Sequence, residues 1–171
     1  FPVELLAEAD LAEAAAAIRA EFSPATATLA GAVWTLEDGV LTISGTGEMV
    51  GFGPQYVECS APWKDHASQI VKFVIGDVVT IIAAHTSAYC TNLTSVTLPS
   101  TITSIDANAF WGCSSLTEIQ IPVSVKSIIF GAFKDTGLEI VHYDGTREQW
   151  DQITIGACNE CLTGAQIIVK E

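Results

Sequence analysis

Five cysteines give this chain its most reactive side chains, and two of them lie close together as Cys158-x-x-Cys161. That spacing is shared by redox dithiols and by one half of many zinc sites. A redox pair needs a helix N-terminus in a β-α-β setting, and a zinc site needs two further ligands, which no second cysteine pair supplies. We therefore expect no zinc, and two interpretations stay open: a structural disulfide or two unrelated thiols.

Cys90 and Cys113 stand at equivalent places in two similar stretches of the sequence. Side chains at equivalent places on stacked segments point in parallel, so their Cβ atoms stay too far apart for a relaxed disulfide. We expect free thiols that fill a small site in the core. The odd cysteine count, which includes Cys59, also argues against a complete disulfide framework in an exported protein.

The three histidines, His66, His85 and His142, are far apart and show no pairing with serine, cysteine or acid that is typical of catalysis. We expect them in surface or half-buried structural roles. The glycine-rich stretch 45–54 lacks the Lys-Ser/Thr of a phosphate loop. Asn92 begins a glycosylation sequon, but we interpret it as a polar loop residue. No group of residues converges on a reaction, so we expect no enzyme activity and no cofactor.

The charge balance is strongly acidic, with 20 acidic against 7 basic residues and a formal net charge of −13. Nucleic acids and anionic lipid surfaces would repel such a chain, so neither is an expected partner. Calcium binding would need clustered oxygen ligands, whereas the acidic residues are scattered. No apolar run approaches the roughly 20 residues that cross a bilayer. With 171 residues the chain suits one domain, with or without an appendage.

The N-terminal 30 residues predict a helix and a linker. Residues 3–22 are rich in Ala, Leu and Glu, which are strong helix formers, and Ser23-Pro24 ends the pattern. The stretch 24–31 is typical of a linker. Because the chain begins at Phe1 rather than Met, we expect a trimmed or processed form.

Residues 31–69 predict a cap for whatever follows. Two alternating stretches flank Asp38-Gly39, a pair that supplies the positive φ angles of a tight turn, so we expect hairpin strands near 32–36 and 40–44. Pro62 favours the start of a short helix over 62–68.

From residue 70 the sequence repeats, with units that begin at Ile70, Leu93, Leu116 and Leu138. A single unit of this length cannot bury its apolar side, whereas stacked units can. Each unit begins with an alternating stretch that predicts a short strand, and successive strands should pair in parallel. The aligned positions that should point inward are Phe73, Val96, Ile119 and Val141; Ile75, Leu98, Ile121 and Tyr143; Val79, Ile102 and Val125; Ile82, Ile105 and Ile128; and Phe110 and Phe133.

These features predict a right-handed repeat solenoid over residues 70–144. One face should carry a short parallel sheet, and the other should carry loops, 3-10 turns or short helical turns. The end coils of a solenoid need covers for their exposed core, so we expect the divergent residues 145–171 to form a C-terminal cap.

The second unit, LTSVTLPSTITSIDANAFWGC, resembles the repeat of the BspA-like, spirochaete-type leucine-rich-repeat family, L-x-x-I-x-I-P-x-x-V-x-x-I-x-x-x-A-F-x-x-C. The third unit departs at Thr136, in place of Cys, and the first at Gly76 and Ser87, in place of Pro and Phe. The likeness covers about residues 33–169. It implies a secreted or surface-displayed bacterial protein, without enzyme activity, that takes part in adhesion and protein–protein contact.

Alternation along the strands indicates where such a protein would bind. Residues between the inward positions should face outward and offer a small mixed surface to a protein, such as a host extracellular protein, or to a glycan. The alternative is a structural spacer or display stalk without a ligand. Trp111 is a further candidate anchor on the opposite side, or a packed surface residue. The candidate binding residues are Lys72, Val74, Ser95, Thr97, Glu118, Gln120, Ile140 and His142.

Overall fold

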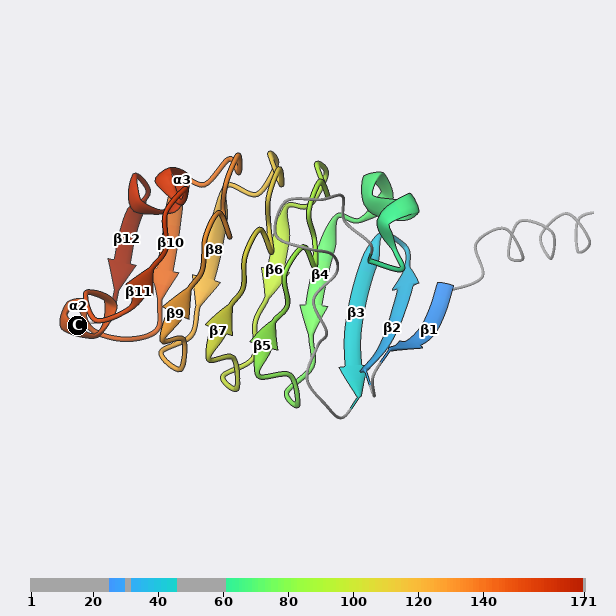
Figure 1. The fold of residues 1–171 in the computed structure, drawn as a ribbon, viewed down its shortest axis with the longest axis horizontal. Helices are drawn as coiled ribbons and strands as arrows, with labels where there is room; N and C mark the ends of the chain where they lie inside the picture. Colours follow the sequence, from blue (N-terminus) through green and yellow to red (C-terminus); the bar gives the residue numbers. More distant parts are fainter. Residues whose placement is uncertain (1–24, 30–31, 46–60, 171) are drawn as a thin grey trace, which may run out of the picture.

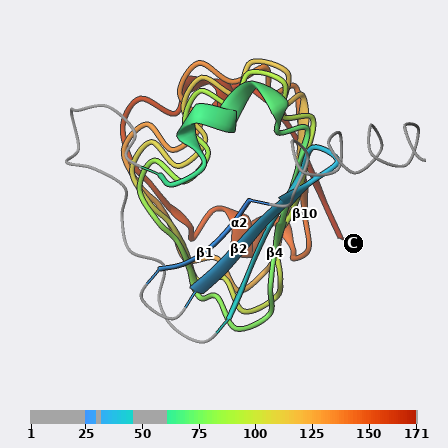
Figure 2. The same ribbon diagram turned by 90° about the vertical axis from the view of Figure 1, so that its right-hand side faces the viewer.

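The computed structural model describes residues 25–29, 32–45 and 61–170. They form a solenoid whose strands stand in two rows along its length (Figure 1). Viewed along its axis, the successive coils superimpose as closed outlines (Figure 2). The leucine-rich-repeat solenoid predicted from the sequence is confirmed. The helix expected over 3–22 and the residue Cys59 lie outside the described residues.

An antiparallel hairpin opens the described chain, as predicted. Strands β2 (Ala32–Glu37) and β3 (Val40–Gly45) pair around Asp38 and Gly39, whose φ angles are 48° and 76°. The linker prediction was wrong over Ala25–Leu29, which form β1 and pair antiparallel with β2. Without β1, the outer edge of β2 would present unpaired backbone groups, and pairing satisfies them.

The first row of strands carries the predicted parallel sheet. Strand β4 (Lys72–Ile75) pairs with β3 on one side and with β6 (Ser95–Thr97) on the other. Beyond a break, β8 (Glu118–Ile121) pairs with β10 (Ile140–Tyr143). The expectation that strands of successive coils always pair was wrong at one step, because β6 and β8 share no ladder.

The second row is also a parallel sheet, where the sequence predicted only loops or short helical turns. It consists of two-residue strands, and it runs unbroken along four coils. Each strand has one inward residue: Ile82, Ile105 and Ile128 are fully buried in the first three strands, and Ile155 is partly buried in the last. Two residues give too short an alternation to be recognised in a sequence. The strands are β5 (Ile81–Ile82), β7 (Ser104–Ile105), β9 (Ser127–Ile128) and β11 (Thr154–Ile155).

The inward columns form one continuous core between the two sheets. Phe110 lies at its centre, with its ring 5.2 Å from that of Phe133 and 6.5 Å from that of Phe73. The first coil has Ser87 where the next two coils have Phe110 and Phe133. Phe73 therefore supplies to the first coil the aromatic ring that its turn lacks.

The turns that follow the second sheet need left-handed backbone at the same places in successive coils. One such column comprises His85, Asn108 and Gly131, with φ of 59°, 56° and 62°. Glycine at 131 is required twice over, because a Cβ there would also come within 2.5 Å of Asn108 Oδ1. A second column comprises Tyr89, Gly112 and Asp135, whereas Cys158, with a φ of 61°, continues the first column.

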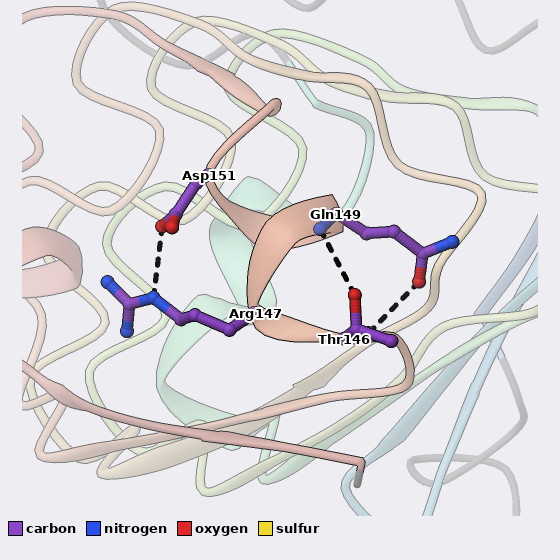
Figure 3. Close-up of polar contacts among 4 residues, drawn as sticks. All are labelled: Thr146, Arg147, Gln149 and Asp151. Carbon is purple, nitrogen blue, oxygen red and sulfur yellow. Dashed lines mark hydrogen bonds and ion pairs between the residues drawn. The ribbon is translucent and has the colours of Figure 1, made fainter.

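Short helical elements lie at both ends. The 3-10 helix η1 (Lys64–Gln69) replaces the predicted helix 62–68, and the preceding Trp63 packs edge-on against Trp34 at 5.6 Å. Near the other end lies α2 (Arg147–Trp150), where Thr146 and Gln149 form a reciprocal capping box and Arg147 pairs with Asp151 (Figure 3).

The described part of the cap expected over 145–171 extends both sheets instead of only covering them. Besides β11, it forms α3 (Glu160–Thr163) and β12 (Gln166–Val169), which pairs in parallel with β10. The inward residues of this last strand, Ile167 and Val169, are only partly buried, because no further coil covers them in the described structure.

Candidate binding surface

The eight residues predicted to face outward do lie on one face of the first row, in two hydrogen-bonded blocks. In one block, Lys72 is in register with Ser95, and Val74 with Thr97. In the other, Glu118 is in register with Ile140, and Gln120 with His142. The inward neighbours in these strands are buried, so the alternation places the eight side chains away from the core.

A seam separates the two blocks, between β6 and β8. Ser95 N donates to Val71 O at 3.3 Å, and in the next block Ile140 N donates to Thr117 O at 3.1 Å. No equivalent bond joins Glu118 N to Thr94 O in the described chain. The second sheet stays paired between these same two coils through β7 and β9. The coils therefore separate on the outward face only.

The core beneath the seam is less covered than elsewhere. Val96 keeps 9% of its surface exposed, whereas Phe73 and Val141 in the same column keep none. In the next column, Leu98 is only partly buried, whereas Ile121 is fully buried. The missing ladder therefore brings apolar side chains close to the surface.

A shallow depression of about 370 Å³ lies over the seam. Four of the predicted residues line it, whereas Lys72, Val74, Thr97 and Ile140 lie outside it. Sequence reasoning missed Thr94, which precedes its strand and therefore has no place in the alternation. The lining consists of Thr94, Ser95, Val96, Glu118, Ile119, Gln120 and His142.

Polar contacts orient the side chains on the far side of the seam. His142 Nε2 lies 3.6 Å from Glu118 Oε2. Gln120 Nε2 donates to Asp144 Oδ1 at 2.9 Å, and Lys170 Nζ lies 2.9 Å from the same oxygen. The hydrogen bond from Lys170, with a smaller contribution from Gln120, lowers the pKa of Asp144. The depression thus presents a carboxylate, an amide, an imidazole and hydroxyl groups above two apolar residues.

The cysteines lie away from this surface. Cys90 and Cys113 are both buried, as predicted, and Cys113 Sγ lies 3.0 Å from Ser87 O. Cys158 and Cys161 are free and partly buried. Of the two interpretations left open for this pair, the structure therefore has the two separate thiols and not the disulfide. Within the described ranges, no three or more acidic, histidine or cysteine residues gather as metal ligands would.

His85 and Asn92 do not line the depression. His85 is fully buried, deeper than the surface or half-buried role expected for it. Asn92, interpreted as a loop residue, donates from Nδ2 to Ser68 O at 2.7 Å and so ties the second coil to the first. None of the helices in the described part of the chain has the length and apolar character of a membrane span.

Stacked parallel strands, continuous apolar columns and an outward polar face define a leucine-rich-repeat solenoid. The BspA type leucine rich repeat region matches residues 65–168 in six copies, and the chain belongs to this family. No curated protein is similar enough to be matched.

Several solved structures of bacterial leucine-rich-repeat proteins are similar to this chain. One from Eubacterium ventriosum is 21% identical, with a TM-score of 0.61, over 87% of this chain and 45% of the other. This chain thus spans a little less than half of that protein. One from Bacteroides capillosus is 24% identical, with a TM-score of 0.46, over 70% and 99%. A leucine rich cell surface protein from Faecalibacterium prausnitzii is 20% identical, with a TM-score of 0.33, over 86% and 55%.

Proposed function

We propose that this chain is a non-enzymatic binding module of a bacterial surface or secreted protein, and that it recognises a protein partner through the outward face of β4, β6, β8 and β10. The observation that carries the proposal is the seam, where an interrupted ladder produces a depression lined by both polar and apolar groups. Protein interfaces combine these features, with apolar contacts at the centre and hydrogen bonds around them.

Unpaired backbone groups support the same proposal. In a parallel ladder, alternate residues direct their N–H and C=O groups to opposite neighbours. Because Ser95 N–H points to β4, the backbone groups of Val96 point into the seam. An extended segment of a partner can satisfy such groups, as partners do at exposed sheet edges.

The proposed location follows from the family and not from the geometry. BspA-like leucine-rich-repeat proteins are displayed or secreted, as the resemblance implies, and adhesion is the role that we propose for this chain. Surface labelling of intact cells with antibody against the solenoid, before and after external protease treatment, tests the location. A signal that resists protease until the cells are lysed would contradict it.

Binding is tested with the whole chain, immobilised and exposed to purified extracellular-matrix proteins, with surface plasmon resonance as the readout. Thr97→Arg places a long cation beside the seam, and Gln120→Ala removes an amide from its lining. We expect either change to weaken binding by at least about tenfold. Thr154→Ala is the matched control, because it alters an exposed residue of β11 in the other sheet.

Two results would contradict the proposal. A partner whose affinity is equal in all three variants would bind elsewhere on the chain. The absence of binding to every protein of the panel would favour the alternative function, a spacer or display stalk.

A further inference from the structure

An aromatic pair lies in the turns after the second sheet, outside the depression over the seam. The ring of Tyr89, in the first coil, lies 4.8 Å from that of Trp111, in the second, at an angle of 47°. The third coil adds Lys134, with Nζ 5.0 Å from the centre of the indole, and Asp135, which accepts a hydrogen bond from Trp111 Nε1 at 3.0 Å. Three successive coils thus contribute to one surface cluster.

The backbone at Tyr89 is unfavourable for the residue that occupies it. Its φ angle is 62°, and the equivalent places in the next two coils hold Gly112 and Asp135. Left-handed backbone costs a residue with a Cβ about 1–2 kcal/mol, and glycine avoids this cost. A strained residue with a large side chain therefore indicates a role other than folding stability.

The surrounding residues hold the aromatic pair in place without covering it. A Cβ at position 112 would approach Tyr89 Cδ1 to 3.0 Å, so Gly112 leaves room for the tyrosine ring. Trp111 is half-buried and fixed by its bond to Asp135. Tyr89 nevertheless keeps 48% of its surface exposed. The result is a preorganised aromatic platform.

The charges beside the platform identify the ligand class. Asp135 and Lys134 carry opposite charges, so the cluster has no net charge to attract an ion. An arginine of a partner would gain from the aromatic ring but would meet the ammonium of Lys134. A sugar ring presents an apolar C–H face to an aromatic ring and hydroxyl groups at its rim. The carboxylate, the ammonium and the tyrosine hydroxyl match that rim as acceptors and donors.

We propose that Tyr89, Trp111, Lys134 and Asp135 form a binding site for a neutral oligosaccharide. The site is independent of the protein-binding function proposed for the sheet face, and either can fail without the other. One molecule can therefore engage a protein and a glycan through different sides of the same coils.

The test is titration of the whole chain with maltohexaose, cellohexaose and chitohexaose, followed by the NMR signal of the Trp111 indole N–H and by calorimetry. We expect at least one sugar to shift that signal with a dissociation constant in about the millimolar range or below. Tyr89→Gly should weaken binding by at least about tenfold, because the platform is lost. Tyr89→Phe keeps the ring and should bind within about threefold of the unchanged chain.

Stability separates a binding role from a packing role. Tyr89→Gly suits the left-handed backbone, so its melting temperature should equal or exceed that of the unchanged chain. A less stable variant would assign Tyr89 to packing and overturn the proposal. So would the absence of a shift with all three sugars, binding that survives Tyr89→Gly, or binding of hexa-arginine in place of the sugars.

Discussion

At the scale of single residues, Asn159 shows how a side chain completes a hydrogen-bonding pattern where the coils end. In earlier turns the next coil supplies the acceptor, since Ser87 N donates to Ala109 O and Phe110 N to Ala132 O. At the equivalent place in the third coil, Phe133 N donates to Asn159 Oδ1 at 2.9 Å. Asn159 Nδ2 in turn donates to Ile129 O at 2.9 Å.

Asn159→Ala should lower the free energy of unfolding by about 2–4 kcal/mol, because it leaves buried backbone groups without partners. Urea unfolding followed by circular dichroism measures the loss. Asn92→Ala is the control, because that exposed side chain makes one hydrogen bond and its loss should cost less than about 1 kcal/mol. Equal losses in the two variants would show that burial does not decide the effect.

Because the thiol of Cys113 is buried, we expect the folded chain to lose stability in alkali. Burial raises the pKa of its thiol from 9.0 to about 12. The folded chain therefore keeps the proton at pH values where the unfolded chain has lost it, so this contribution is complete below about pH 9 and declines as the pH rises toward 12.

Comparison of the unchanged chain with Cys113→Ala tests this expectation. The difference between their unfolding free energies should be smaller at about pH 10.5 than at about pH 8, because only the unchanged chain has the buried thiol. If the difference in unfolding free energy were the same at both pH values, the expected pH dependence would be contradicted. In alkylation at about pH 8, the partly buried Cys158 and Cys161 should react before Cys113.

At the scale of elements, the seam divides the first row of strands while the second row stays continuous. The interruption is not visible in the repeat, because Val96 and Ile119 occupy equivalent places in similar units. Pairing depends on the separation of two backbones, which side-chain periodicity does not report. The columns were thus predictable, and the missing ladder was not.

Amide hydrogen exchange should locate the seam. The N–H groups of Val96 and Gln120 point toward it, whereas those of Ile119 and His142 lie in the ladder between β8 and β10. We expect the first two to exchange at least about tenfold faster than the second two, because they lack ladder partners. Equal protection, measured residue by residue with NMR, would show that β6 and β8 pair in solution.

At the scale of the whole molecule, cohesion depends on contacts between neighbouring coils, as in other solenoids. Phe110 connects three coils, because its fully buried ring packs against Phe73 in the first and Phe133 in the third. The packing of Trp34 against Trp63 and of Trp150 against Tyr143 gives fluorescent reporters near opposite ends.

Phe110→Ala should lower the free energy of unfolding by about 3–5 kcal/mol, since it leaves a cavity at the centre of the core. Because the cavity lies between coils, we also expect the two ends to unfold at different urea concentrations. Versions that keep only Trp34 and Trp63, or only Trp150, allow each end to be followed by fluorescence. Transitions that coincide at both ends, with the same urea midpoint as the unchanged chain, would contradict the linking role of Phe110. Thr97→Ala is the control, because Thr97 is exposed.

The hairpin, the coil repeat and the inward columns could be predicted from the residues alone. These features depend on local turn chemistry, such as Asp38-Gly39, and on periodic burial, both of which are written along the chain. The family followed from the same repeat, which matches over residues 65–168.

Four features emerge only in the folded chain: the pairing of β1, the second sheet, the seam and the approach of Tyr89 to Trp111. Each depends on how far apart two coils or strands lie, and that spacing results from packing throughout the core. Alternation told which side chains of a strand face outward. It contained no information on which of these side chains line the same depression, because the depression forms where two neighbouring strands are not paired.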